Sequence, residues 1–72
     1  MELAKFVEKF IEGFESHIQD LADGNGSKLV NLRDEYKQKA LSYYDEIVDA
    51  GATVTNDDLV NCIEIQAEKV GF

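Results

Sequence analysis

Residues 2–22 read ELAKFVEKFIEGFESHIQDLA, and their apolar side chains return every three or four positions. That period places them on one face of an α-helix, whereas a half-buried strand would alternate at every second residue. Charged and amide side chains occupy the opposite face. The segment therefore predicts one amphipathic helix over residues 2–22. Its Phe6, Phe10 and Phe14 stand four residues apart, which is the spacing of a core stripe.

A second helix is expected over residues 28–50. Its apolar positions cover a broader surface than one neighbouring helix needs, so we expect it to be the central helix, contacted on both sides. Ser27 is the expected N-cap, because a serine side chain can accept a hydrogen bond from the first free N–H groups. Gly51 is the expected residue of positive φ after the helix end.

A third helix is expected over residues 56–70. Thr55 and Asp58 have the spacing of a capping pair at its start. The residues that the helical period turns inward are Leu59, Val60, Ile63, Ala67 and Val70. Cys62 and Ile65 fall outside this inward arc, and they leave a surplus of apolar surface for a helix with one buried face.

The three helices belong to one domain, residues 1–72. The breaks at 23–27 and 51–55 combine glycine with capping residues and are too short to link two domains. We therefore predict an all-α protein, a compact antiparallel three-helix bundle with helices at about 2–22, 28–50 and 56–70. The frame from Met1 to Phe72 is expected to be the whole protein.

Composition restricts the class of partner. The 72 residues include 15 acidic and 7 basic side chains, a net charge of −8, and 44% are apolar, which excludes a disordered acidic tail. The negative charge disfavours nucleic acid and anionic membrane and favours a basic protein surface or a cation. There is no run of membrane-spanning length and no secretory signal. The single cysteine, Cys62, cannot form an internal disulfide, so we expect a cytoplasmic protein.

The segment DGNGSKLVNLRD, residues 23–34, places oxygen-bearing side chains at positions 1, 3, 5, 9 and 12. This spacing resembles the calcium loops of the EF-hand and dockerin families, and the resemblance implies a site formed by Asp23, Asn25, Ser27 and Asp34. It covers twelve residues, has Lys28 where those loops have glycine, and lacks a paired second loop. The interpretation that we favour is a glycine turn followed by a helix cap, with no metal.

No catalytic set is predicted. His17 is the only histidine and Cys62 the only cysteine, which is too few groups for a nucleophile with its base or for a metal site within one chain. The acidic neighbours Asp58 and Glu64 disfavour a reactive thiolate at Cys62. We therefore expect a protein that is not an enzyme and has no cofactor.

The distribution of charge is the most informative feature of the sequence. Residues 40–72 contain seven acidic residues and one lysine, a net charge of −6. Asp45, Glu46 and Asp49 fall in the last turns of the second helix, where the helix dipole disfavours each anion by about 0.3 to 1 kcal/mol. An acidic cluster at a place that stability does not favour indicates a binding surface. The competing interpretation is a solvated face that only maintains solubility.

We therefore expect a small interaction protein that binds a larger basic protein, such as a nucleic-acid-binding one, through Asp45, Glu46 and Asp49. Tyr44 and Ile65 are the expected apolar anchors. By analogy with small acidic helical proteins of phages and mobile elements, it would be an inhibitor or regulator. Two alternatives stay open. One is a calcium-binding protein that uses residues 23–34, and the other is a self-assembling oligomer, a homodimer through Cys62 and Ile65.

Overall fold

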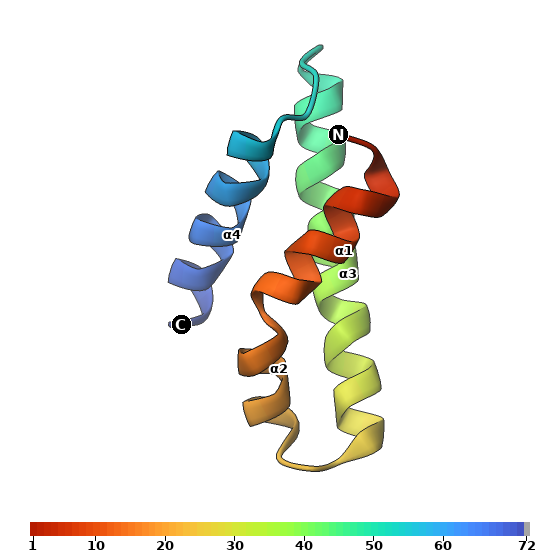
Figure 1. The fold of residues 1–72 in the computed structure, drawn as a ribbon, viewed down its shortest axis with the longest axis vertical. Helices are drawn as coiled ribbons and strands as arrows, with labels where there is room; N and C mark the ends of the chain where they lie inside the picture. The colour runs from red at the N-terminus through yellow and green to blue at the C-terminus, as the bar shows by residue number, and fades with distance from the viewer. Residues whose placement is uncertain (72) are drawn as a thin grey trace.

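The computed structural model describes residues 1–71, which form helices joined by short turns and, within that range, no strand (Figure 1). The helices are α1 (Leu3–Gly13), α2 (Glu15–Ala22), α3 (Gly26–Asp49) and α4 (Asn56–Val70). α1 and α2 run in one direction, α3 returns beside them, and α4 reverses again. The prediction of an all-α antiparallel bundle is confirmed, with the first of its three legs divided into two helices.

The division of the first leg corrects the prediction of one helix over residues 2–22. Phe14 leaves the helical region (φ −111°, ψ 7°), and its N–H donates to the carbonyl of Ile11 at 3.0 Å, one residue short of the α-helical partner. The preceding residue, Gly13, is a poor helix former. It also faces α4 closely, since an added Cβ would lie 3.1 Å from Cδ1 of Ile63. The break thus lies where α4 approaches the first leg.

The core is built on the aromatic stripe of α1 and α2. Phe6, Phe10, Phe14 and Ile18 have no exposed surface, which confirms the predicted core stripe. Each phenylalanine meets one tyrosine of α3, with ring centroids 5.3 Å apart for Phe6 and Tyr44, 5.9 Å for Phe10 and Tyr43, and 5.1 Å for Phe14 and Tyr36. These tilted and edge-on geometries are the favourable ones for aromatic pairs. The first leg and α3 are therefore joined along their shared length.

The central position belongs to α1, not to α3 as we predicted. α1 packs against α3 on one side and α4 on the other, whereas α3 and α4 have no substantial packing against each other. Side chains such as Tyr43 of α3 and Gln66 of α4 connect the two instead, through a hydrogen bond of 3.1 Å. The broad apolar surface of α3 is used by α1 and α2 together, because the break at Phe14 places both on it.

α4 is rotated relative to the prediction. Its buried residues are Leu59, Cys62 and Gln66, so the prediction that Cys62 lies outside the inward arc is wrong. Residues predicted to face inward are exposed instead, Val60 by 44% and Val70 by 37%. The reason is that α4 packs mainly on α1, which needs a narrower stripe. The contact of Ile63 with Gly13 and the hydrogen bond to Gln66 select the stripe that is buried.

The residues that end and cap the helices are the predicted ones, with one exception. Thr55 and Asp58 form a complete capping box, and Gly51 has a φ of 81°, as predicted. The cap of α3 is Asn25 and not Ser27, because the side chain of Asn25 accepts from the N–H of Lys28 at 3.0 Å. Asparagine and serine are about equally good caps. The helix therefore begins two residues earlier than predicted.

Truncation of Phe10, the middle ring of the aromatic stripe, should show how far the fold depends on that stripe. We expect Phe10→Ala to lower the free energy of unfolding by about 3 to 5 kcal/mol, because it leaves a cavity beside Tyr43. Phe10→Leu should cost about 1 to 2 kcal/mol and keep the protein folded for measurement. Urea denaturation followed by circular dichroism measures both. The control is Val30→Ala at a residue that is 66% exposed. An equal loss in all variants would contradict this account of the core.

Candidate functional site

Asp45, Glu46 and Asp49 lie in the last turns of α3, and all three are exposed. We call them the acidic ridge. The last turn of α3 contains no basic residue, so nothing on this helix offsets the unfavourable interaction of the carboxylates with the helix dipole. Asp45 and Asp49 are also one turn apart, and like charges at that spacing repel each other. The location predicted from the sequence is therefore exposed and electrostatically unfavourable.

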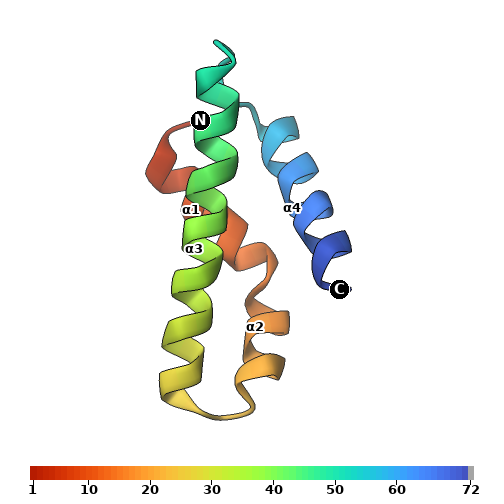
Figure 2. The ribbon, with the colours of Figure 1, turned by 180° about the vertical axis from the view of Figure 1, so that it is seen from behind.

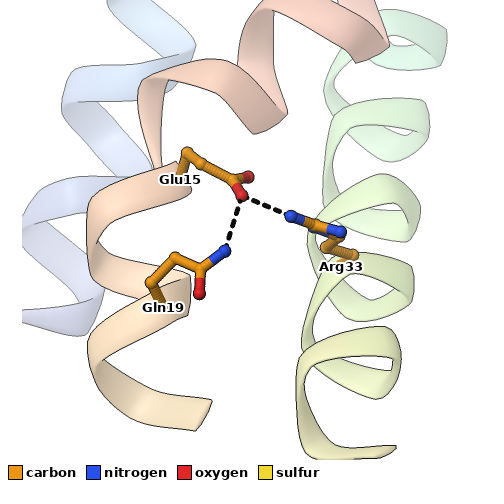
Figure 3. A network of polar contacts seen from close by, with 3 residues as sticks. All are labelled: Glu15, Gln19 and Arg33. Atoms are coloured by element: carbon orange, nitrogen blue, oxygen red, sulfur yellow. Dashed lines mark hydrogen bonds and ion pairs between the residues drawn. The ribbon is translucent and has the colours of Figure 1, made fainter. Parts of the chain in front are cut away.

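Basic residues elsewhere on α3 do not neutralise the acidic ridge. Arg33 pairs instead with Glu15 of α2, which also accepts a hydrogen bond from Gln19 at 3.0 Å (Figure 3). The hydrogen bond from Arg33, followed by that from Gln19, holds the pKa of Glu15 below its usual value. Within residues 1–71, no ridge side chain forms a hydrogen bond or an ion pair. The ridge carboxylates are thus available to an external cation.

Tyr44, a predicted anchor, lies half-buried beneath the ridge. Its hydroxyl donates to the carbonyl of Met1 at 2.9 Å, and its ring meets Phe6 edge-on. The amino terminus of Met1 in turn donates to the carbonyl of Val54 at 2.6 Å. These bonds tie together the start of α1, the end of α3 and the segment before α4. Tyr44 is therefore engaged in contacts within the fold, which hold the end of α3 against the amino terminus.

Ile65 and Cys62, the other predicted apolar residues, differ in exposure. Ile65 is 46% exposed, whereas Cys62 is only 6% exposed and belongs to the core. Burial, followed by the negative charges of Asp58 and Glu46, raises the pKa of the Cys62 thiol. Cys62 is therefore not part of a surface patch with Ile65, which corrects that prediction.

A groove that the sequence analysis missed is formed by residues of α2, α3 and α4. Figure 2 shows the backbones of these three helices from behind. The groove has a volume of about 340 Å³. Its lining residues come from three helices and are His17, Leu21, Leu32, Glu35, Tyr36, Lys39, Gln66 and Val70. We call this the seam groove. The sequence signal was weak, because Leu21 and Val70 are the last apolar residues of stripes that were expected to be buried.

The predicted calcium residues are not brought together. α3 begins at Gly26, so Ser27 and Asp34 both lie on a helix, where seven residues separate them by about 10 Å along the axis. The side chain of Asn25 is occupied as the helix cap, and Asp23 is a left-handed residue that ends α2. Among the described residues, no group of three or more histidine, cysteine and acidic side chains could hold a metal ion. The twelve residues form a turn and a helix start.

Comparison with known proteins gives no assignment. No family model matches the sequence, and the searches of curated proteins and of solved structures also found no match. In the part of the chain that the structure describes, no helix has both the length and the apolar character needed to cross a membrane. The acidic ridge and the seam groove are therefore the features that can indicate a function.

The assignment of Arg33 to Glu15 can be tested by titration. We expect Arg33→Met to raise the pKa of Glu15 toward its usual value of 4.5, because the variant removes the main group that stabilises the carboxylate. Carbon-detected NMR of the glutamate carboxyl groups over a pH series measures this change. In the wild type, the pair stabilises the fold above the unfolded pKa, and this contribution is lost as the pH falls through the lowered pKa.

Lys37→Met is the matched control, since it removes a positive charge from the same helix without removing the hydrogen bond to Glu15. It should leave the pKa of Glu15 near its wild-type value. An unchanged pKa of Glu15 in Arg33→Met would contradict the assignment of Arg33 to Glu15.

Proposed function

We propose that this chain is a small non-enzymatic interaction protein whose acidic ridge binds a basic surface of a larger protein. The observation that carries the proposal is the acidic ridge itself, three exposed carboxylates without a partner in residues 1–71 at the unfavourable end of α3. A basic partner would supply the positive charge that the chain places elsewhere. The net charge of −8 would also accelerate the encounter with such a partner by electrostatic steering.

The surroundings of the ridge support this proposal. Two more acidic residues, Asp57 and Asp58, begin α4 after a short connection, so negative charge gathers where α3 ends and α4 starts. These two are favourable for stability, because they lie at a helix amino terminus. Ile65 offers an exposed apolar side chain on α4. Protein-binding surfaces commonly combine charged and apolar side chains.

The type of basic surface can be specified further by the spacing of the ridge. Asp45 and Asp49 are one helical turn apart, about 6 Å along the axis. The phosphates of nucleic acid are also regularly spaced anions, and nucleic-acid-binding proteins contact them with basic residues. We therefore propose a nucleic-acid-binding protein as the partner and competition with nucleic acid as the mode of action, that of an inhibitor or regulator.

Stability measurements can separate the ridge from ordinary surface acids. We expect Asp49→Lys to raise the free energy of unfolding by about 0.3 to 1 kcal/mol, because it replaces an anion by a cation at the end of α3. Asp57→Lys, the same change at the start of α4, should lower it by a similar amount. Urea denaturation of both variants measures the difference. A loss of stability in Asp49→Lys would mean that the fold itself compensates this carboxylate.

Binding of the partner tests the proposed function directly. The partner is captured from the native lysate, identified by mass spectrometry, and its dissociation constant is measured over a series of salt concentrations. We expect the triple variant Asp45→Lys, Glu46→Lys and Asp49→Lys to weaken binding at least tenfold, or by about 1.4 kcal/mol, and to reduce its salt dependence. The variant should remain folded, because no intramolecular bond of these side chains is lost.

The control is a second triple variant with the same change in net charge, Glu8→Lys, Glu12→Lys and Asp20→Lys, at exposed positions of the first leg. It should affect binding much less than the ridge variant does. Equal losses in the two would mean that the net charge matters and the ridge does not. An unchanged affinity and salt dependence in the ridge variant would exclude this surface.

A further inference from the structure

We propose that α4 opens from the rest of the bundle as a unit, while α1, α2 and α3 stay folded, and that Tyr43 is the latch that holds it closed. This inference goes beyond the proposed function and does not depend on the acidic ridge. The observations that carry it are the placement of the aromatic core, the contacts that hold α4, and the burial of Cys62 on the inner face of α4.

The aromatic core does not include α4. The three phenylalanine–tyrosine pairs all join the first leg to α3, and residues 56–70 contain no aromatic side chain. Within residues 1–71, α3 packs substantially against both α1 and α2, whereas α4 does so only against α1. We call α1, α2 and α3 together the body. The body therefore keeps its aromatic pairs and its main helix packing when α4 opens.

The inner face of α4 is narrow. Its buried residues are Leu59, Cys62 and Gln66. Ile63 lies against Gly13, the one residue of α1 that has no side chain, and on the outer side Val60 and Ile65 are 44% and 46% exposed. The largest fully buried side chains all belong to the first leg. Segments with few buried apolar contacts are those that open locally in proteins, so α4 is the helix expected to open.

Tyr43 makes two polar contacts that join α3 to α4. Its hydroxyl donates to Oε1 of Gln66 at 3.1 Å, and Nζ of Lys69 lies 5.7 Å from the centre of its ring. Gln66 and Lys69 are one turn apart on α4, so they lie on one face of the helix and leave Tyr43 together. The ion pair of Arg33 with Glu15, by contrast, joins α2 to α3 inside the body. Tyr43 thus holds the last turns of α4.

The chain before α4 is anchored to the body. Val54 is 3% exposed, and its carbonyl accepts a hydrogen bond from the amino terminus of Met1 at 2.6 Å. Thr55 and Asp58 cap α4 through bonds to each other, so opening of the helix leaves the capping box intact. Val54 and Thr55 therefore mark the pivot at which α4 turns away without losing its own first turn.

Opening of α4 exposes Cys62, the only cysteine of the chain. In the closed form Cys62 is 6% exposed, and burial raises the pKa of its thiol, so the closed form reacts slowly with electrophiles. In the open form the thiol meets solvent, together with the face of α1 that carries Gly13. α4 is thus a strap over an apolar face and a thiol, and Tyr43 controls access to both.

Alkylation of Cys62 by N-ethylmaleimide, an uncharged reagent, tests this opening on the full chain. Mass spectrometry measures the rate over a urea series, and circular dichroism measures global unfolding over the same series. The rate in the unfolded chain gives the intrinsic reactivity of the thiol. We expect alkylation in water to be about tenfold or more faster than global unfolding allows. Its dependence on urea should be weaker, because opening of α4 exposes less surface than unfolding of the chain does.

Two tyrosine variants give the matched comparison. We expect Tyr43→Phe to raise the alkylation rate about threefold to tenfold, because it removes the hydrogen bond to Gln66 and keeps the ring beside Phe10. Tyr36→Phe removes a hydroxyl from the same helix, at a ring that packs on Phe14 of the body. The alkylation rate of this control should stay within about twofold of the wild type.

A variant of the body separates local opening from global unfolding. The first turns of α3 extend past the end of α4 (Figure 2), and Leu29 packs there against the core. We expect Leu29→Ala to lower the urea midpoint of global unfolding and to leave the alkylation rate in water within about twofold of the wild type. A rise in alkylation that matches the loss of global stability would mean that Cys62 reacts only from the unfolded chain.

Hydrogen exchange of the α4 amides is the second measurement. We expect the amides of residues 59–67 to exchange with the same free energy of opening as the alkylation of Cys62, and more readily than those of α1 and α3. The inference is overturned by alkylation that follows global unfolding, by equal rates in Tyr43→Phe and Tyr36→Phe, or by α4 amides as protected as those of the body. None of these results bears on the acidic ridge, which is tested by binding of the captured partner.

Discussion

The pairing of three phenylalanines with three tyrosines is the interaction on which the rest of the structure depends. Phe6, Phe10 and Phe14 are fully buried, and each meets a tyrosine ring of α3. In a chain of this length the apolar core is small, so a few large rings supply much of the burial. The pairing also directs the tyrosine hydroxyls outward, where those of Tyr43 and Tyr44 bond to α4 and to the amino terminus. The aromatic core thereby positions α4 and the amino terminus relative to α3.

The same core explains why α3 and α4 have no substantial packing against each other and why the acidic ridge is unpaired. Because α1 occupies the centre, α4 is held against α1 and away from α3. Arg33 lies opposite α2, where it pairs with Glu15, and it is thus unable to serve the carboxyl end of its own helix. The seam groove and the acidic ridge are thus separate features of α3, the first lined by residues up to Lys39 and the second at the end of the helix.

Much of the fold could be predicted from sequence because helical periodicity and capping are local properties. The stripe from Phe6 to Ile18, the capping box of Thr55 and Asp58, and the positive φ of Gly51 all follow from neighbouring residues. The break at Phe14 could not be predicted in the same way, because Gly13 is tolerated in many helices. Its effect here depends on the approach of Ile63 from α4. The choice of Asn25 over Ser27 was between two caps of nearly equal strength.

For the candidate site, the sequence by itself determined the charge and location of the acidic ridge, since order along a helix places Asp45, Glu46 and Asp49 at its carboxyl end. The seam groove and the roles of Tyr44, Cys62 and Gln66 were decided by the tertiary structure alone. The physical reason is that the sequence shows which residues form the apolar stripe of a helix. It does not show how many neighbouring helices will cover that stripe. α4 has one substantial neighbour, α1, so its buried face is narrower than predicted and includes Cys62 and Gln66. Ile65 and Val70 are exposed.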